Sequence, residues 1–308
     1  MTTVVDRPVP RTVVRREPAT PGRPPRRTLS DIQVVIARPL LVIALFLVWI
    51  LVYLIVLSPF QESHAQHRLY SQLRTELALG EAPTGAPIDA GKPVALLSIP
   101  RAGVKNQVVV EGTSTRQLQD GPGHLRGSVL PGQHGTSVLL GRALSFAAPF
   151  GRLDRLRAGD PIKVTTGQGT FTYTVADARR KGDPVPAAPT DAKDGRLTLV
   201  TAVGSGFASR LTPSDTVYVD ATLTGKAVGP GPVATVVADE RPMKAHVSAG
   251  TLAFLALSLQ LLIAAFIGAA WLRARWSHLG AWIVGTPMIV AALWVVSSLA
   301  SQLLPNLI

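Results

Sequence analysis

Three long apolar stretches without any charged residue interrupt an otherwise polar chain. They cover residues 39–60, 247–272 and 279–304. The first contains 22 residues and, at about 1.5 Å per residue, would reach about 33 Å as a helix, enough to cross the hydrocarbon core of a bilayer. We therefore predict three transmembrane helices, with the last two joined by a tight hairpin loop.

The first apolar stretch has a competing interpretation as a cleaved signal peptide. The apolar region of a signal peptide is shorter and ends in small residues that form a cleavage site. Here the stretch ends in Ser58-Pro59-Phe60, which is a poor cleavage site. The pattern therefore favours an uncleaved membrane anchor.

Residues 93–223 show a different pattern, in which short apolar-rich segments alternate with turns rich in Gly, Pro and Asp. In the segment TFTYTVA, Phe171, Tyr173 and Val175 fall on one face and threonines on the other, as in a half-buried strand. The expected strands cover 94–99, 107–110, 137–141, 161–166, 170–176, 196–202 and 216–223. Many short strands at this spacing predict a small closed β-barrel.

Two further segments connect the barrel to the apolar stretches. Residues 61–92 begin with leucines at every fourth position, Leu69, Leu73 and Leu77, which predicts a juxtamembrane amphipathic helix followed by a linker. Gly80 is suited to end that helix. Residues 224–246, rich in Gly and Pro at their start, are expected to form a second linker.

The net charge of +12 is informative mainly through its distribution. Residues 1–38 carry eight arginines and three acids and show no apolar periodicity, so we interpret them as a disordered basic cytoplasmic tail. Because positively charged segments stay in the cytoplasm, we expect this tail and the Arg273/Arg275 loop on the cytoplasmic side of a plasma membrane. Residues 61–246 are then expected on the extracytoplasmic side. The basic residues then face membrane lipid. Because the basic tail has no interleaved aromatic residues, we expect no nucleic acid partner.

The chain contains no cysteine. This excludes disulfides, thiolate metal sites, iron–sulfur clusters and a cysteine nucleophile. His64 and His67 lie three residues apart, but without a third ligand nearby they do not predict a metal site. We expect neither a metal nor any other cofactor.

Six short motifs in residues 94–223 occur in the order found in sortases, the envelope transpeptidases of Gram-positive bacteria, which this region resembles. The motifs are LSIP (97–100), VVVEGT (108–113), GPGH (121–124), LPGQHG (130–135), FGRLDRLRAGD (150–160) and TLVTA (198–202). The resemblance implies a barrel of about eight strands with a peptide groove on one wall. The predicted fold is thus a mainly β extracytoplasmic domain, a sortase-like closed β-barrel, plus three transmembrane α-helices.

The resemblance also implies a catalytic cysteine, histidine and arginine, and this sequence departs from the pattern at each position. Ala202 stands at the cysteine position and Arg142 at the histidine position. The arginine position falls on Arg210 if counted forward from Ala202, and on Thr216 if the last strand is aligned, which we favour. No catalytic residue is therefore expected, and Arg142, Ala202 and Arg210 are candidates for substrate binding.

These substitutions favour a catalytically inactive protein that binds an extended peptide or an envelope protein partner in cell-surface assembly. One alternative is a transpeptidase or hydrolase that uses another nucleophile such as Ser205, with His124 or His134 as base. The simpler interpretation of both histidines is a turn residue hydrogen-bonded to backbone. A second alternative is a membrane scaffold that binds an integral membrane partner through residues 247–308.

Overall fold

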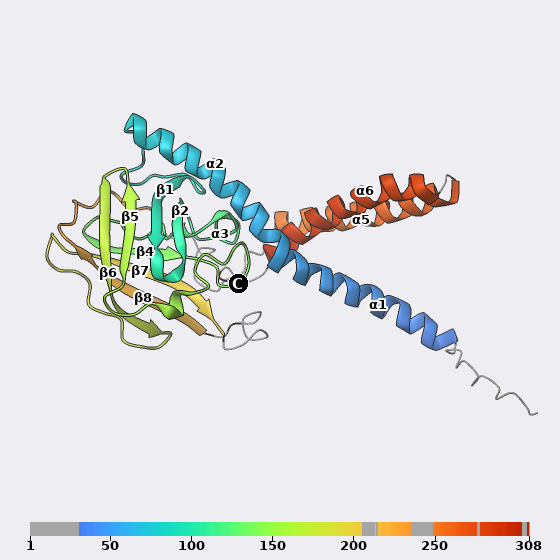
Figure 1. Ribbon diagram of the computed structural model, residues 1–308, viewed down its shortest axis with the longest axis horizontal. Coiled ribbons are helices and arrows are strands. Elements are labelled where there is room, and N and C mark those ends of the chain that lie inside the picture. The colour runs from blue at the N-terminus through green and yellow to red at the C-terminus, as the bar shows by residue number, and fades with distance from the viewer. Residues whose placement is uncertain are drawn as a thin grey trace, which may run out of the picture. The chain divides into compact units, whose positions relative to one another are not determined.

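A computed structural model describes residues 31–204, 213, 215–235, 249–275, 278–303 and 307. The chain divides into two compact units, residues 1–46 and residues 47–308. The first unit holds most of helix α1, and the second holds the β-barrel and the remaining helices (Figure 1).

Eight strands form one closed barrel in the order β1-β2-β3-β4-β7-β8-β6-β5, and β5 pairs with β1 to complete the ring. Their bounds are β1 Pro93–Ile99, β2 Val104–Glu111, β3 Gly123–His124, β4 Gly135–Leu140, β5 Pro161–Thr166, β6 Gly169–Arg180, β7 Gly195–Val203 and β8 Asp215–Thr224. Short helical turns lie between them, namely η2 Pro100–Ala102, α3 Gln117–Asp120 and η3 Leu153–Arg155. The predicted mainly β fold with a closed barrel is confirmed.

Alternation of apolar residues along each strand fills the barrel. Phe171, Tyr173 and Val175 of β6 all point into the core, as their spacing predicts. Leu199 of β7 and Val219 of β8 join the same cluster and are fully buried. The alternate residues of β7 and β8 point to the outer face of the sheet. They are therefore available to form a site outside the barrel core.

A long helical segment precedes the barrel. It consists of α1 (Asp31–Val52), a π-helical turn η1 (Tyr53–Leu57) and α2 (Ser58–Leu79). Helix α1 begins at Asp31, so residues 31–38, which the sequence assigned to the tail, are helical. Gly80 caps α2 in a left-handed conformation with φ of 71°, as predicted for a helix end.

Helix α2 is joined to the barrel through a polar side chain. The Gln66 Oε1 atom accepts the Val108 N–H at 2.8 Å, and its Nε2 donates to the carbonyls of Val108 at 3.0 Å and Asp120 at 2.7 Å. Leu73, one of the three periodic leucines, is buried. The predicted amphipathic helix thus packs on β2 and α3.

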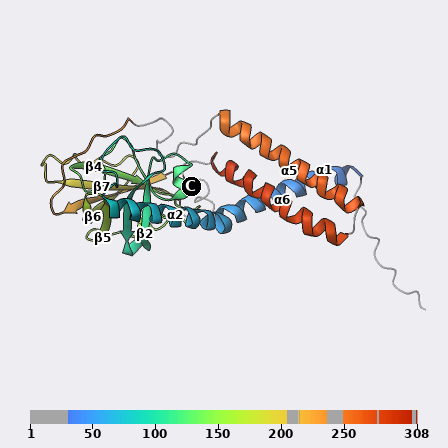
Figure 2. The ribbon, with the colours of Figure 1, turned by 90° about the horizontal axis from the view of Figure 1, so that it is seen from above.

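The described part of the chain has three helices long and apolar enough to cross a membrane, within Leu40–Leu79, Ala249–Arg275 and Gly280–Ser301. Helices α5 (Ala249–Arg275) and α6 (His278–Ser301) lie side by side (Figure 2). Trp49 Nε1 donates to Ser297 Oγ of α6 at 2.9 Å. The hairpin therefore contacts other parts of its own chain.

Candidate functional site

Arg142, Ala202 and Thr216 correspond to the catalytic positions of the family that the sequence resembles. They lie in one row, just after β4, near the end of β7 and near the start of β8. Strands β4 and β7 pair in parallel with Leu140 opposite Val200, and the Gly141 N–H continues the ladder to the Val200 carbonyl at 3.0 Å. Two residues beyond this pair, the same register brings Arg142 level with Ala202. On the other side, Ala202 pairs directly with Thr216 of β8.

Ala202 lies on the outer face of the sheet, away from the barrel core. It clusters with Leu140 and Val200, which share this face, and with Leu118 of α3. Only 3% of Ala202 is exposed. The cavity beside it is about 30 Å³, which is large enough for a water molecule but too small for a peptide.

Arg142 is completely buried, with 0% of its surface exposed. Its guanidinium donates to the Leu118 carbonyl at 3.1 Å, the Thr115 carbonyl at 3.1 Å and Ser145 Oγ at 3.0 Å, and it stacks over the Phe146 ring at 4.9 Å. Burial lowers the pKa of Arg142 to about 9, so the group remains a cation at neutral pH. In this structure Arg142 ties α3 to the loop after β4 and presents no surface to a substrate.

The other candidate residues are placed only in part. Thr216, the alternative for the arginine position, is buried beside Ala202. Arg210 and Ser205 lie outside the described residues. The hydroxyl of Thr201, next to Ala202, donates to the Gly141 carbonyl at 2.9 Å.

A scan against protein-family models matches residues 97–223 to the family described as "Sortase domain". This range contains the whole row from Arg142 to Thr216. Residues 97–223 are a sortase domain. A relative among curated proteins is Sortase D of Bacillus subtilis (strain 168), 30% identical over 91 residues, which are 30% of this chain and 44% of that protein. The chain thus spans less than half the length of this relative.

Solved sortase structures are similar to the same region. A Clostridium perfringens sortase D5 transpeptidase is 23% identical with a TM-score of 0.43, covering 53% of this chain and 99% of that chain. Sortase C1 from Streptococcus agalactiae is 30% identical with a TM-score of 0.37, covering 46% of this chain and 70% of that chain.

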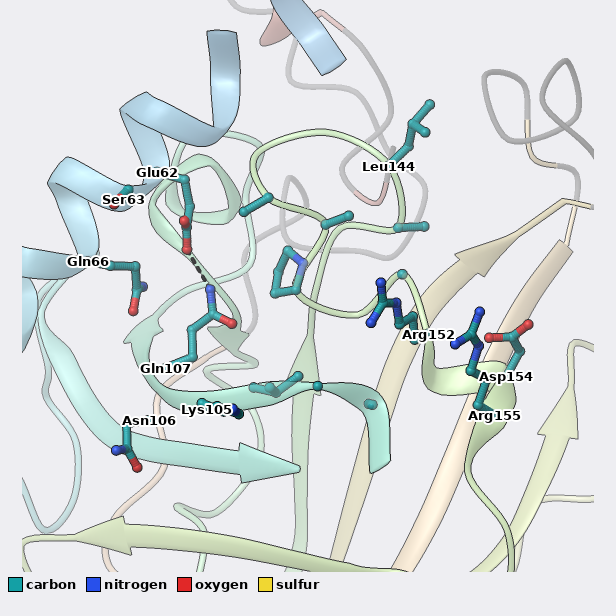
Figure 3. Close-up of a pocket in the computed structure, with 18 residues that line it drawn as sticks. Glu62, Ser63, Gln66, Lys105, Asn106, Gln107, Leu144, Arg152, Asp154 and Arg155 are labelled. Carbon is teal, nitrogen blue, oxygen red and sulfur yellow. Dashed lines mark hydrogen bonds between the residues drawn. The ribbon is translucent and has the colours of Figure 1, made fainter. Parts of the chain in front are cut away.

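A large polar groove lies next to the row formed by Arg142, Ala202 and Thr216. It has a volume of about 800 Å³ and shares Ala143, Gly151 and Asp154 with the small cavity at Ala202. Figure 3 shows side chains from three elements around it, namely Glu62 and Gln66 of α2, Lys105 and Gln107 of β2, and Arg152 and Arg155 near η3. Sequence reasoning missed this groove, because no motif links these distant segments.

A second cluster in the sortase domain has the order of a nucleophile, a base and an acid. His124 Nδ1 lies 2.8 Å from Glu111 Oε2, and its Nε2 lies 3.1 Å from Ser128 Oγ. However, Nε2 also lies 3.0 Å from the Val129 carbonyl, which can only accept, so Nε2 donates to this carbonyl and offers no lone pair to the Ser128 hydroxyl. Ser128 Oγ already donates to the Leu125 carbonyl at 2.7 Å.

This cluster therefore fixes a turn and does not activate a nucleophile. His134 is bound in a similar way, with Nδ1 3.0 Å from the Asp194 carbonyl. Both histidines make the backbone contacts expected of turn residues.

Proposed function

We propose that this chain is a membrane-anchored, extracytoplasmic sortase-domain protein without transpeptidase chemistry, which binds an extended peptide or an envelope protein during cell-surface assembly. The observation that carries the proposal is the methyl group of Ala202 at the position where the family has its thiol. A methyl group has no lone pair to attack a carbonyl carbon. The barrel around it is otherwise complete.

Arg142, which lies level with Ala202, stands where the family chemistry needs a general base. A general base needs a free lone pair at the working pH, whereas the guanidinium of Arg142 remains protonated and only donates. Its donors are also directed to Leu118, Thr115 and Ser145, all within the protein. Neither the nucleophile nor the base of the family chemistry is thus available from this row.

The charge distribution supports a plasma-membrane topology with the N-terminus in the cytoplasm and residues 61–246 outside. A contact between the barrel and α6 agrees with it, because Gln119 Nε2 donates to Ser301 Oγ at 2.9 Å. This bond requires the end of α6 and the barrel to be on one side of the membrane. With three crossings, both basic segments then fall on the other side.

The polar groove supports the binding role. Its volume of about 800 Å³ is within the range of ligand sites. It offers three basic side chains, Lys105, Arg152 and Arg155, and two acidic ones, Glu62 and Asp154. Mixed charge and the exposed amide of Asn106 suit the backbone and polar side chains of an extended peptide better than an acyl chain.

Site-specific cross-linking from the groove tests the binding role. Because the chain has no cysteine, Lys105→Cys provides a single attachment point for a photoactivatable cross-linker in the groove. In the envelope of the cells that make this protein, we expect a discrete cross-linked product from this position. Thr222→Cys on β8, which lies opposite β2 in the barrel order and is exposed, is the matched control that should give none. The same products from both positions would contradict a partner in the groove.

A further inference from the structure

The outer face of the sheet at Ala202 is covered by a residue from the far end of the chain. Leu307, in the segment that follows α6, is fully buried with 0% exposed. It packs in the same apolar cluster as Leu118, Leu140, Val200 and Ala202. Its side chain is therefore part of the apolar cluster that contains the position of the family nucleophile.

A main-chain hydrogen bond fixes Leu307 in this place. The Ala143 N–H donates to the Leu307 carbonyl at 2.9 Å. Ala143 directly follows Arg142 in the loop that leaves β4, and its partly buried side chain packs against the same cluster. A backbone bond together with one aliphatic side chain in a pocket is how an extended peptide is held on a sheet edge or loop.

The end of α6 is attached to the same part of the barrel. Ser301, the last residue of α6, accepts the hydrogen bond from Gln119, and both side chains are buried. Gln119 belongs to α3, whose Leu118 is part of the apolar cluster. Two contacts, at Ser301 and at Leu307, thus connect the membrane hairpin with the site.

We propose that Leu307 is an internal occupant of the sortase site, and that its side chain covers the apolar face at Ala202 and closes it. Any peptide that packs an aliphatic side chain on this face must first displace Leu307. This inference goes beyond the proposed function, since the closure exists whether or not a partner binds.

Thiol labelling at the covered position tests the closure. Ala202→Cys introduces the only thiol of the full chain, so intact-mass measurement of its modification by N-ethylmaleimide in detergent micelles reports access to this site. We expect slow labelling when Leu307 is present. Adding Leu307→Ala removes most of the side chain that covers this position, so labelling should become faster by on the order of tenfold or more.

Two controls make the result specific. Leu303→Ala, in the same segment but only partly buried, should leave the labelling rate of Ala202→Cys unchanged. Lys163→Cys on the exposed face of β5 should label rapidly with or without Leu307→Ala. Equal labelling rates for Ala202→Cys alone and for Ala202→Cys combined with Leu307→Ala would overturn the proposal. So would a rate for Ala202→Cys as fast as that of Lys163→Cys.

A disulfide test gives an independent answer if Ala202→Cys disturbs the cluster. The Ala143–Leu307 backbone bond brings these two residues within reach of a disulfide. The pair Ala143→Cys and Leu307→Cys should therefore cross-link under mild oxidation, whereas Ala143→Cys with Leu303→Cys should not. Absence of the first cross-link in a folded chain would also contradict the closure.

Discussion

Replacing Arg142 with methionine is expected to destabilise the barrel by about 2–4 kcal/mol. Methionine is of similar length but donates no hydrogen bonds, so the buried Thr115 and Leu118 carbonyls lose their contacts with the guanidinium. The gain from no longer burying a cation offsets only part of this loss. Thermal unfolding of the full chain in detergent measures the effect, at roughly 2–4 °C per kcal/mol.

Arg152→Met is the matched control for this substitution. Arg152 lies in the same loop region but is exposed at the groove, so its replacement should change stability by no more than about 0.5 kcal/mol. Equal shifts for the two variants would show that the buried contacts of Arg142 do not hold α3 in place. The burial of Ala202 behind Leu118 would then need another explanation.

Gly132→Ala is expected to cost about 2–4 kcal/mol, because two separate penalties act at this position. Gly132 has φ of +96°, and a Cβ there would lie 2.2 Å from the Phe171 ring. Its N–H also donates to the Tyr173 hydroxyl at 2.6 Å. Burial raises the pKa of Tyr173 to about 12, so the hydroxyl that accepts this bond stays neutral over the ordinary pH range.

Gly182→Ala separates the two penalties. Gly182 has a similar φ of +100°, but no atom lies within 4 Å of the position of a Cβ. Only backbone strain remains, so we expect a loss of about 1 kcal/mol. Thermal unfolding of both variants should rank Gly132→Ala well below Gly182→Ala, and equal midpoints would show that the barrel yields easily at Phe171.

The barrel could be predicted from sequence because its information is local. Alternation in β6 identified Phe171, Tyr173 and Val175 as core residues, and all three are in the core. Aligning the last strand put the family's arginine position at Thr216, and the pairing of β7 and β8 places Thr216 directly beside Ala202. Strand β3, with two residues, was too short to show a pattern.

The environment of the site could not be predicted, because it depends on contacts between distant segments. An arginine next to a strand end indicates a binding residue, and nothing in the sequence shows that Arg142 is enclosed by α3 and Phe146. Leu307 is one leucine among many in an apolar region, and its place above Ala202 depends on where α6 ends. The attachment of α2 through Gln66 has the same origin.

These contacts give the site a consistent architecture. Arg142 holds α3, α3 supplies Leu118, and Leu118 with Ala202 forms the apolar face that Leu307 covers. In the family that this domain belongs to, the corresponding surface carries out covalent chemistry. Here the same three positions, Arg142, Ala202 and Thr216, are buried within the protein.

The most direct test of the central claim is a turnover measurement with the unmodified full chain. Incubated with peptides that carry a sorting signal and with an amine acceptor, the purified protein is predicted to leave every peptide intact by mass spectrometry, because Ala202 supplies no nucleophile. A Ser205→Ala variant run in parallel should be indistinguishable. Cleavage or transfer by the unmodified protein, above all if Ser205→Ala abolished it, would contradict the account.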